Sequence, residues 1–248
     1  MRLVLSLLLF LPTLPLIANP LFSGFTAEYD VIRNDMLLGV SKRQLVARDN
    51  GTKLDYSSTT YPEGLVAMFF SDRFMEHSQV AITANGLQPM SYEYQRTNGN
   101  HDMIFWAKFD WQKKQITMSS QTEPQALLPD TQDLLSFQLA IMQGLEQGQR
   151  HFRFQLVDHK RIQTQNLQYI KTERTPSSLG MLDMLTLEHK ASDGKYRFMF
   201  WCAKQLHYLP IKIQKIEQDG TIIMLRLRSF NKQAFRLLDN NPATDPDP

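Results

Sequence analysis

The stretch DTQDLLSFQLAIMQGLEQGQ, residues 130–149, is the one long segment of this sequence with the periodicity of an α-helix. Asp130 is a good N-cap residue, and Gly148 suits the left-handed position that ends a helix. Apolar side chains cover more than half of the helical circumference: Leu134, Leu135, Phe137, Leu139, Ile141, Met142 and Leu145. Such a helix is typical of a buried position. We therefore expect one buried helix at about residues 131–147.

The segments on both sides of this helix alternate apolar and polar residues. Examples are GFTAEYDVI (24–32), MSYEYQR (90–96), MIFWAKFDW (103–111) and KYRFMFWCA (195–203). A period of two with many aromatic residues predicts half-buried strands, and Asn-Gly and Asp-Gly pairs between them predict tight turns. The fold class is therefore all-β, a single strongly curved antiparallel sheet or open barrel around the helix. Two alternatives stay open, a hollow beside the helix and a completely filled core.

The two ends of the chain differ in composition from the middle. Residues 1–18 begin with Met1 and Arg2, continue as an apolar run with Pro12 and Pro15, and end at Ala18, which indicates a cleaved signal peptide. The alternative, a membrane anchor, would need a run of roughly 20 apolar residues without breaks. We expect a single β domain over residues 22–236 and a disordered tail over 237–248, where Pro and Asp are frequent. The mature protein would be periplasmic and would have no transmembrane segment.

Charge and reactive residues exclude several function classes. The 27 Lys and Arg residues nearly balance the 25 Asp and Glu residues, so the charge gives no reason to expect a nucleic-acid partner. Cys202 is the only cysteine, so an intramolecular disulfide is impossible, and its aromatic-rich strand favours a buried thiol. The six histidines show no metal-ligand spacing, and we find no nucleophile or phosphate-binding motif. The sequence therefore predicts no metal, no cofactor and no catalytic residue.

Aromatic and apolar side chains are the remaining candidates for ligand contact. These candidates are Trp106, Trp201, Tyr92, Phe137 and Ile141. Trp106 alternates out of phase with Phe105 and should face away from it. An aromatic ring on a concave face can line an acyl-chain pocket or stack on a sugar, and the alternative for each ring is a core position. Activity on a polysaccharide would draw on polar residues near turns: Tyr61, Glu63, His77 and His101.

Several phrases together resemble one protein family. They are YDVIRNDMLLG (29–39), GLQP and YEY (86–94), DTQDLLSFQLA (130–140), LGMLDMLTLE (179–188) and FWCAKQLHYLPIKI (200–213). This set is similar to the domain-of-unknown-function 3108 family (DUF3108) of exported bacterial envelope proteins, over roughly residues 22–230. The resemblance implies a single, mostly β domain outside the cytoplasm of Gram-negative bacteria. It implies no activity and no catalytic residues.

These observations favour a non-enzymatic binder of an apolar or amphipathic cell-envelope component, with a lipid as the expected ligand. One alternative is an enzyme or binding protein that acts on envelope polysaccharide, with a glycan ligand. A second alternative is an interaction or scaffold protein whose exposed strand edges recruit partners.

Overall fold

The computed structural model describes residues 22–97, 102–159, 161–177, 179–191 and 193–232. These residues form strands, one α-helix and short 3₁₀ segments. In chain order they are β1 (Phe25–Arg33), β2 (Met36–Arg48), η2 (Asp49–Gly51), β3 (Lys53–Pro62), η3 (Gly64–Met68), β4 (Arg73–Thr83), β5 (Gly86–Thr97), β6 (Met103–Asp110), β7 (Gln115–Met118), β8 (Gln125–Ala126), β9 (Thr131–Asp133), α1 (Ser136–Glu146), β10 (His151–Val157), β11 (Ile162–Ser177), β12 (Gly180–Lys190), β13 (Tyr196–Ala203), η4 (Lys204–Leu206), β14 (Leu209–Glu217) and β15 (Ile222–Lys232). The expected signal peptide (1–18) and tail (237–248) lie outside the described residues.

All fifteen strands of the described residues belong to one sheet, in the order β8-β7-β6-β5-β4-β3-β2-β1-β15-β14-β13-β12-β11-β10-β9. The chain runs as two meanders that meet where β1 pairs antiparallel with β15, from Phe25 opposite Lys232 to Arg33 opposite Ile223. β9 pairs with β10 in parallel, and the other neighbours pair antiparallel. The two end strands, β8 and β9, do not pair with each other, so the sheet does not close into a barrel. The expected fold class is confirmed.

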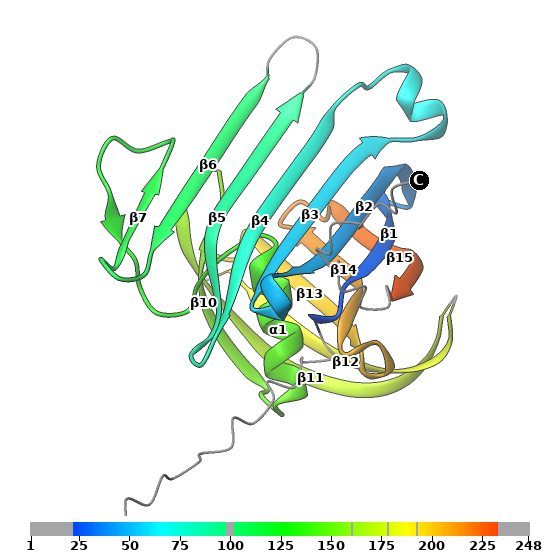
Figure 1. Ribbon diagram of the computed structural model, residues 1–248. Coiled ribbons are helices and arrows are strands. Elements are labelled where there is room, and N and C mark those ends of the chain that lie inside the picture. Colours follow the sequence, from blue (N-terminus) through cyan, green and yellow to red (C-terminus); the bar gives the residue numbers. More distant parts are fainter. Residues whose placement is uncertain (1–21, 98–101, 160, 178, 192, 233–248) are drawn as a thin grey trace, which may run out of the picture.

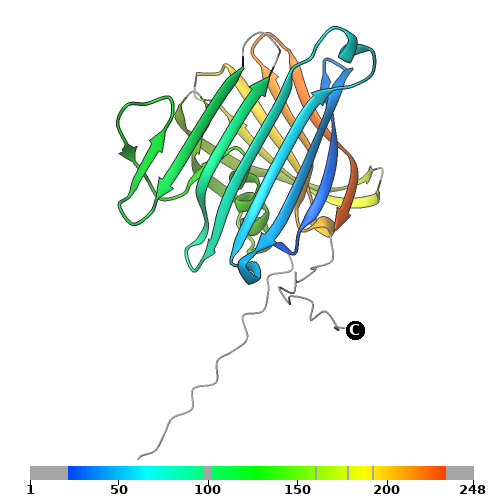
Figure 2. The ribbon, with the colours of Figure 1, turned by 45° about the horizontal axis from the view of Figure 1, so that its top comes forward.

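The sheet bends into two facing walls with the helix between them. Figure 1 shows β3–β7 as one wall and β10–β14 as the other, with α1 held between them. The turned view in Figure 2 shows β1 and β15 joining the walls along one edge. The alternation in the sequence matches this arrangement, because every second side chain faces the enclosed space. On β6, for example, Phe105, Ala107 and Phe109 are buried while Ile104 points outward.

The helix begins later than the sequence predicts. Residues 131–133 are not helical but form β9, which pairs with Gln155, Leu156 and Val157 of β10. Asp130 is exposed and has a left-handed φ of 59°, so it does not cap the helix. Asp133 takes that role, since its carboxylate Oδ1 accepts hydrogen bonds of 2.8 Å from the N–H groups of Leu135 and Ser136. The predicted stop is confirmed, because Gly148 has a φ of 83° and its N–H donates to the carbonyl of Leu145.

The wide apolar surface of α1 is used on two sides. Leu139 and Met142 pack with residues of β5 and β6, such as Tyr92 and Phe105, in one buried cluster. Phe137, Ile141 and Leu145 pack in a second cluster with residues of β10, β12 and β13, among them Phe152, Leu187 and Phe200. A helix between two sheet walls must be apolar toward both, which explains the composition that the sequence shows. The helix touches the second wall closely at Gly144, where a Cβ would lie 2.4 Å from the ring of Phe152.

Candidate functional site

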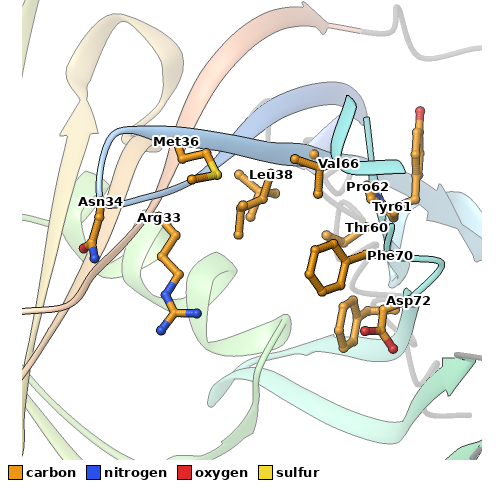
Figure 3. Close-up of a pocket in the computed structure, with 13 residues that line it drawn as sticks. Arg33, Asn34, Met36, Leu38, Thr60, Tyr61, Pro62, Val66, Phe70 and Asp72 are labelled. Atoms are coloured by element: carbon orange, nitrogen blue, oxygen red, sulfur yellow. The ribbon is translucent and has the colours of Figure 1, made fainter. Parts of the chain in front are cut away.

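A hollow of about 640 Å³ opens at the end of the sheet where β1, β2, β3 and β4 meet η3. Figure 3 shows Met36, Leu38 and Phe70 turned toward this space, with Arg33 and Asp72 at its border. We call it the outer hollow. Its lining is mostly apolar and consists of Val31, Arg33, Asn34, Met36, Leu38, Gly39, Thr60, Tyr61, Pro62, Val66, Phe70, Asp72 and Phe74.

Turn geometry and ion pairs position this lining. Asn34 and Asp35 adopt left-handed φ angles of 45° and 65°, which turn β1 tightly into β2. Glu63, just before η3, is held by Arg228 Nη2 at 2.7 Å, and Arg228 Nε lies 2.7 Å from Asp30 Oδ1. Gly39 is required where β2 meets the end of β3, since a Cβ there would lie 2.1 Å from the carbonyl oxygen of Tyr61.

The η3 segment beside the outer hollow and the two residues after it, Phe69 and Phe70, expose large apolar side chains. Leu65 and Phe69 are each 79% exposed, and Met68 and Phe70 are also mostly exposed. Soluble domains rarely expose contiguous apolar surface unless it contacts a ligand, a membrane or a partner. The segment therefore gives the mouth of the outer hollow an apolar rim.

A second, smaller space of about 200 Å³ lies deeper, against the helix; we call it the inner hollow. Its lining residues are Arg43, Glu76, Leu134, Phe137, Gln138, Leu156, Gln165, Leu167, His189, Phe198, Phe200, Ile213 and Leu225. The linings of the two hollows contain neighbouring positions of the sheet. Phe74 of the outer hollow is two residues from Glu76 of the inner hollow on β4. Val31 of the outer hollow is the cross-strand partner of Leu225 of the inner hollow.

Most polar groups that line the inner hollow have partners in the protein. The hydroxyl of Tyr92 donates to Glu76 Oε1 at 2.6 Å. Burial raises the pKa of Glu76, which shifts its carboxyl toward the neutral form. Gln165 Nε2 donates to the hydroxyl of Tyr196 at 3.1 Å, and His189 Nδ1 lies 2.9 Å from a backbone carbonyl oxygen. The inner hollow is thus an apolar space with a few fixed polar groups, a pattern typical of small-molecule sites.

A third space, of about 700 Å³, is a more polar groove that includes Trp201, Lys212, Asp30 and residues near the end of β11. Lys212 Nζ lies 4.2 Å from the centroid of the Trp201 ring, and Arg226 Nη2 lies 3.1 Å from Asp30 Oδ2. The ammonium therefore covers a face of the ring that a sugar would need for stacking.

The five candidate ligand residues do not meet in one site. Trp106 lies on the outer face of β6, as its alternation predicts, and is 36% exposed; Trp201 lines the polar groove. Tyr92 and Ile141 are completely buried in the two core clusters. Phe137 alone among the five lines the inner hollow.

The polar residues considered for polysaccharide chemistry are also dispersed. Tyr61 lines the outer hollow, and Glu63 is engaged by Arg228. His77 Nε2 lies 3.8 Å from a carboxylate oxygen of Asp55 on the outer face, and His101 lies outside the described residues. The described part of the chain contains no cluster of three residues suited to bind a metal ion. Cys202 is buried as expected, and burial raises the pKa of its thiol.

The residues that matter most for the hollows were not predicted from the sequence; they are Arg43, Glu76 and the apolar run that contains η3. The run LVAMFF (65–70) interrupts the strand alternation with six consecutive apolar residues, which was a usable signal for an exposed binding loop. In the residues that the structure covers, no helix has the length and apolar character needed to span a membrane.

Comparisons with known proteins agree with this architecture. The crystal structure of a β-barrel-like protein of domain of unknown function DUF1849 from Brucella abortus is similar, with a TM-score of 0.54 and 12% sequence identity. The match covers 86% of this chain and 98% of that chain and supports the fold alone. No functionally curated protein matches the sequence. Residues 28–228 match the family described as "Protein of unknown function (DUF3108)". The chain therefore belongs to the DUF3108 family.

Proposed function

We propose that this protein is a non-enzymatic binder of an apolar or amphipathic component of the cell envelope. The outer hollow carries the proposal. Its volume of about 640 Å³ lies within the range of roughly 300–1,000 Å³ that is common for ligand pockets. Burial of each ligand methylene in such a space stabilises the complex by ~0.8 kcal/mol, so an acyl chain is a fitting occupant.

The position of the hollow supports a ligand that enters from an apolar environment. Met36, Leu38, Val66 and Phe70 line it, and the exposed side chains of η3 continue the apolar surface outward. Helix α1 fills the space between the walls elsewhere, so the ligand would bind beyond the helix rather than along its whole length. The groove beside Trp201 gives less support to a glycan ligand, because Lys212 already lies over the ring.

Substitution of Val66 by tryptophan tests the site. Val66→Trp places an indole at the wall of the outer hollow and should weaken binding of the neutral fluorescent probe N-phenyl-1-naphthylamine about tenfold or more. Leu65→Trp is the matched control, because Leu65 is exposed and does not line the hollow. Its affinity should stay within about twofold of wild type. Equal probe binding by folded Val66→Trp and wild type, or no co-extracted lipid in mass spectra of the purified protein, would count against the proposal.

Export is the second part of the proposal. The N-terminal residues have the charge, apolar run and small final residue of a signal peptide, which would place the mature chain in the periplasm. Expression of the full chain in a Gram-negative host should yield a periplasmic product that begins at or near Asn19, as N-terminal sequencing can establish. A product that keeps Met1 and stays in the cytoplasm would contradict this part alone.

A further inference from the structure

Arg43 is a buried cation inside the sheet. It lies on β2, is only 7% exposed and lines the inner hollow. Its Nη1 donates to Oε1 of Gln138 on the helix, and its guanidinium lies 4.8 Å from the ring centroid of Tyr29. Arginine keeps its charge in any protein environment, so a full positive charge stands at the wall of a mostly apolar space.

The hydrogen-bonding capacity of Arg43 is not used up by the protein. Among the described residues, Nε of Arg43 has no hydrogen-bond acceptor, although the atom is fully buried. The partner of Nη1 is a neutral amide, and the guanidinium also hydrogen-bonds to the hydroxyl of Tyr56, so these two partners are neutral groups rather than carboxylates. Glu76 lines the same hollow; burial raises the pKa of its carboxyl, and its Oε1 already accepts a hydrogen bond from Tyr92. A buried guanidinium has a desolvation cost that an anionic acceptor on a ligand in the hollow would offset.

We propose that the inner hollow binds the carboxylate head of a single-chain amphipath, a fatty acid in chemical class, with Arg43 as the binding cation and the alkyl chain in the outer hollow. This inference rests on the proposed function and specifies its ligand.

The sizes and linings of the two spaces support this orientation. The inner hollow, about 200 Å³, is small, and the guanidinium of Arg43 that lines it has only donor groups, which favours an acceptor head group. The amides of Gln138 and Gln165 are already engaged within the protein, so a neutral sugar head would find few free partners. The outer hollow is larger and mostly apolar, and its lining residues Phe74 and Val31 are neighbours in the sheet of residues that line the inner hollow. A charged head in the inner hollow and an apolar chain that extends through the outer hollow toward η3 match the linings of the two spaces.

The test compares a fluorescent fatty acid with its uncharged ester. Wild type should bind 11-(dansylamino)undecanoic acid about 10–100-fold more tightly than its methyl ester, since a hydrogen-bonded ion pair is lost in the ester. Arg43→Met should abolish this preference and leave ester affinity within about twofold of wild type. The matched control is Lys42→Met, one residue away, because Lys42 is exposed and pairs with Glu28 at 3.1 Å on the outer face. This control should keep the full preference.

Three further measurements keep the inference open to refutation if Arg43→Met does not fold. Glu76→Gln removes from the same hollow a carboxyl that would repel an anionic head in its ionised form, so it should not weaken binding of the acid relative to the ester. Millimolar acetate should not displace the fatty acid, and hexadecyl phosphate should compete less well than palmitate.

Each contrary outcome has a distinct meaning. Equal affinity of wild type for acid and ester would overturn the role of Arg43 while leaving the proposed function intact. Displacement by acetate would indicate a site for small anions, and stronger competition by hexadecyl phosphate would overturn the carboxylate assignment. Binding of neither probe would overturn the proposed function together with this inference.

Discussion

Asp133→Ala is expected to lower the free energy of unfolding by about 3–5 kcal/mol, a large fraction of the roughly 5–15 kcal/mol that stabilises a typical domain. Asp133 has no exposed surface and joins three elements through its carboxylate. Oδ2 accepts a 2.6 Å hydrogen bond from the hydroxyl of Ser78 on β4, and Oδ1 accepts the N–H groups of Leu135 and Ser136. Alanine would leave three buried donors without their acceptor. Urea unfolding followed by circular dichroism measures the loss.

Two variants distinguish this role from nonspecific damage. Asp133→Asn keeps the shape and an acceptor oxygen, and it should cost about 1–2 kcal/mol. Asp130→Ala removes the aspartate that the sequence favours as the cap, but Asp130 is exposed, so its loss should cost less than about 1 kcal/mol. If Asp130→Ala lowered the free energy of unfolding more than Asp133→Ala, Asp130 would be the helix cap, as the sequence predicts, and the structure would be contradicted.

The two aspartates show why the sequence predicts elements better than their ends. Both lie before the same apolar run and both are good cap residues, so local chemistry does not choose between them. Pairing with β10 determines where the helix starts. Residues 131–133 form a strand with a partner more than 20 residues ahead in the chain, so the helix begins after Asp133. Such long-range pairing is invisible to helical periodicity. The strands themselves were predictable from the sequence. Phe105, Ala107 and Phe109 occupy alternate positions of β6, and all three are apolar because they face the same enclosed side of the sheet.

The hollows were less predictable than the fold for a related reason. Which space stays open depends on how strands distant in sequence and η3 come together around α1, and no local pattern encodes that volume. A partial signal existed at Arg43. Ser41, Arg43 and Leu45 alternate on one face of β2, and all three are buried, whereas Lys42 and Gln44 are exposed. A charged side chain in phase with buried neighbours marks an unusual interior position, and such positions are often functional.

Ile141→Ala is expected to lower the free energy of unfolding by about 2–5 kcal/mol, because removing a fully buried branched side chain leaves a cavity. Ile141 sits in the cluster between α1 and the wall formed by β10, β12 and β13, and it lines neither hollow. Ile104→Ala is the matched control: Ile104 is 68% exposed, so the same truncation should change stability by less than about 0.5 kcal/mol.

The same pair of variants separates packing from binding. A ligand contact at Ile141 would produce a loss of affinity for 11-(dansylamino)undecanoic acid with little loss of stability. The structure predicts the reverse, an affinity within about twofold of wild type under native conditions together with a large loss of stability. This follows because the helix is fixed on both sides by core side chains, and the space for a ligand begins only at its N-terminal end, where Leu134 and Phe137 meet Arg43. A strong affinity loss in a stable Ile141→Ala protein would move the binding site back along the helix and away from Arg43.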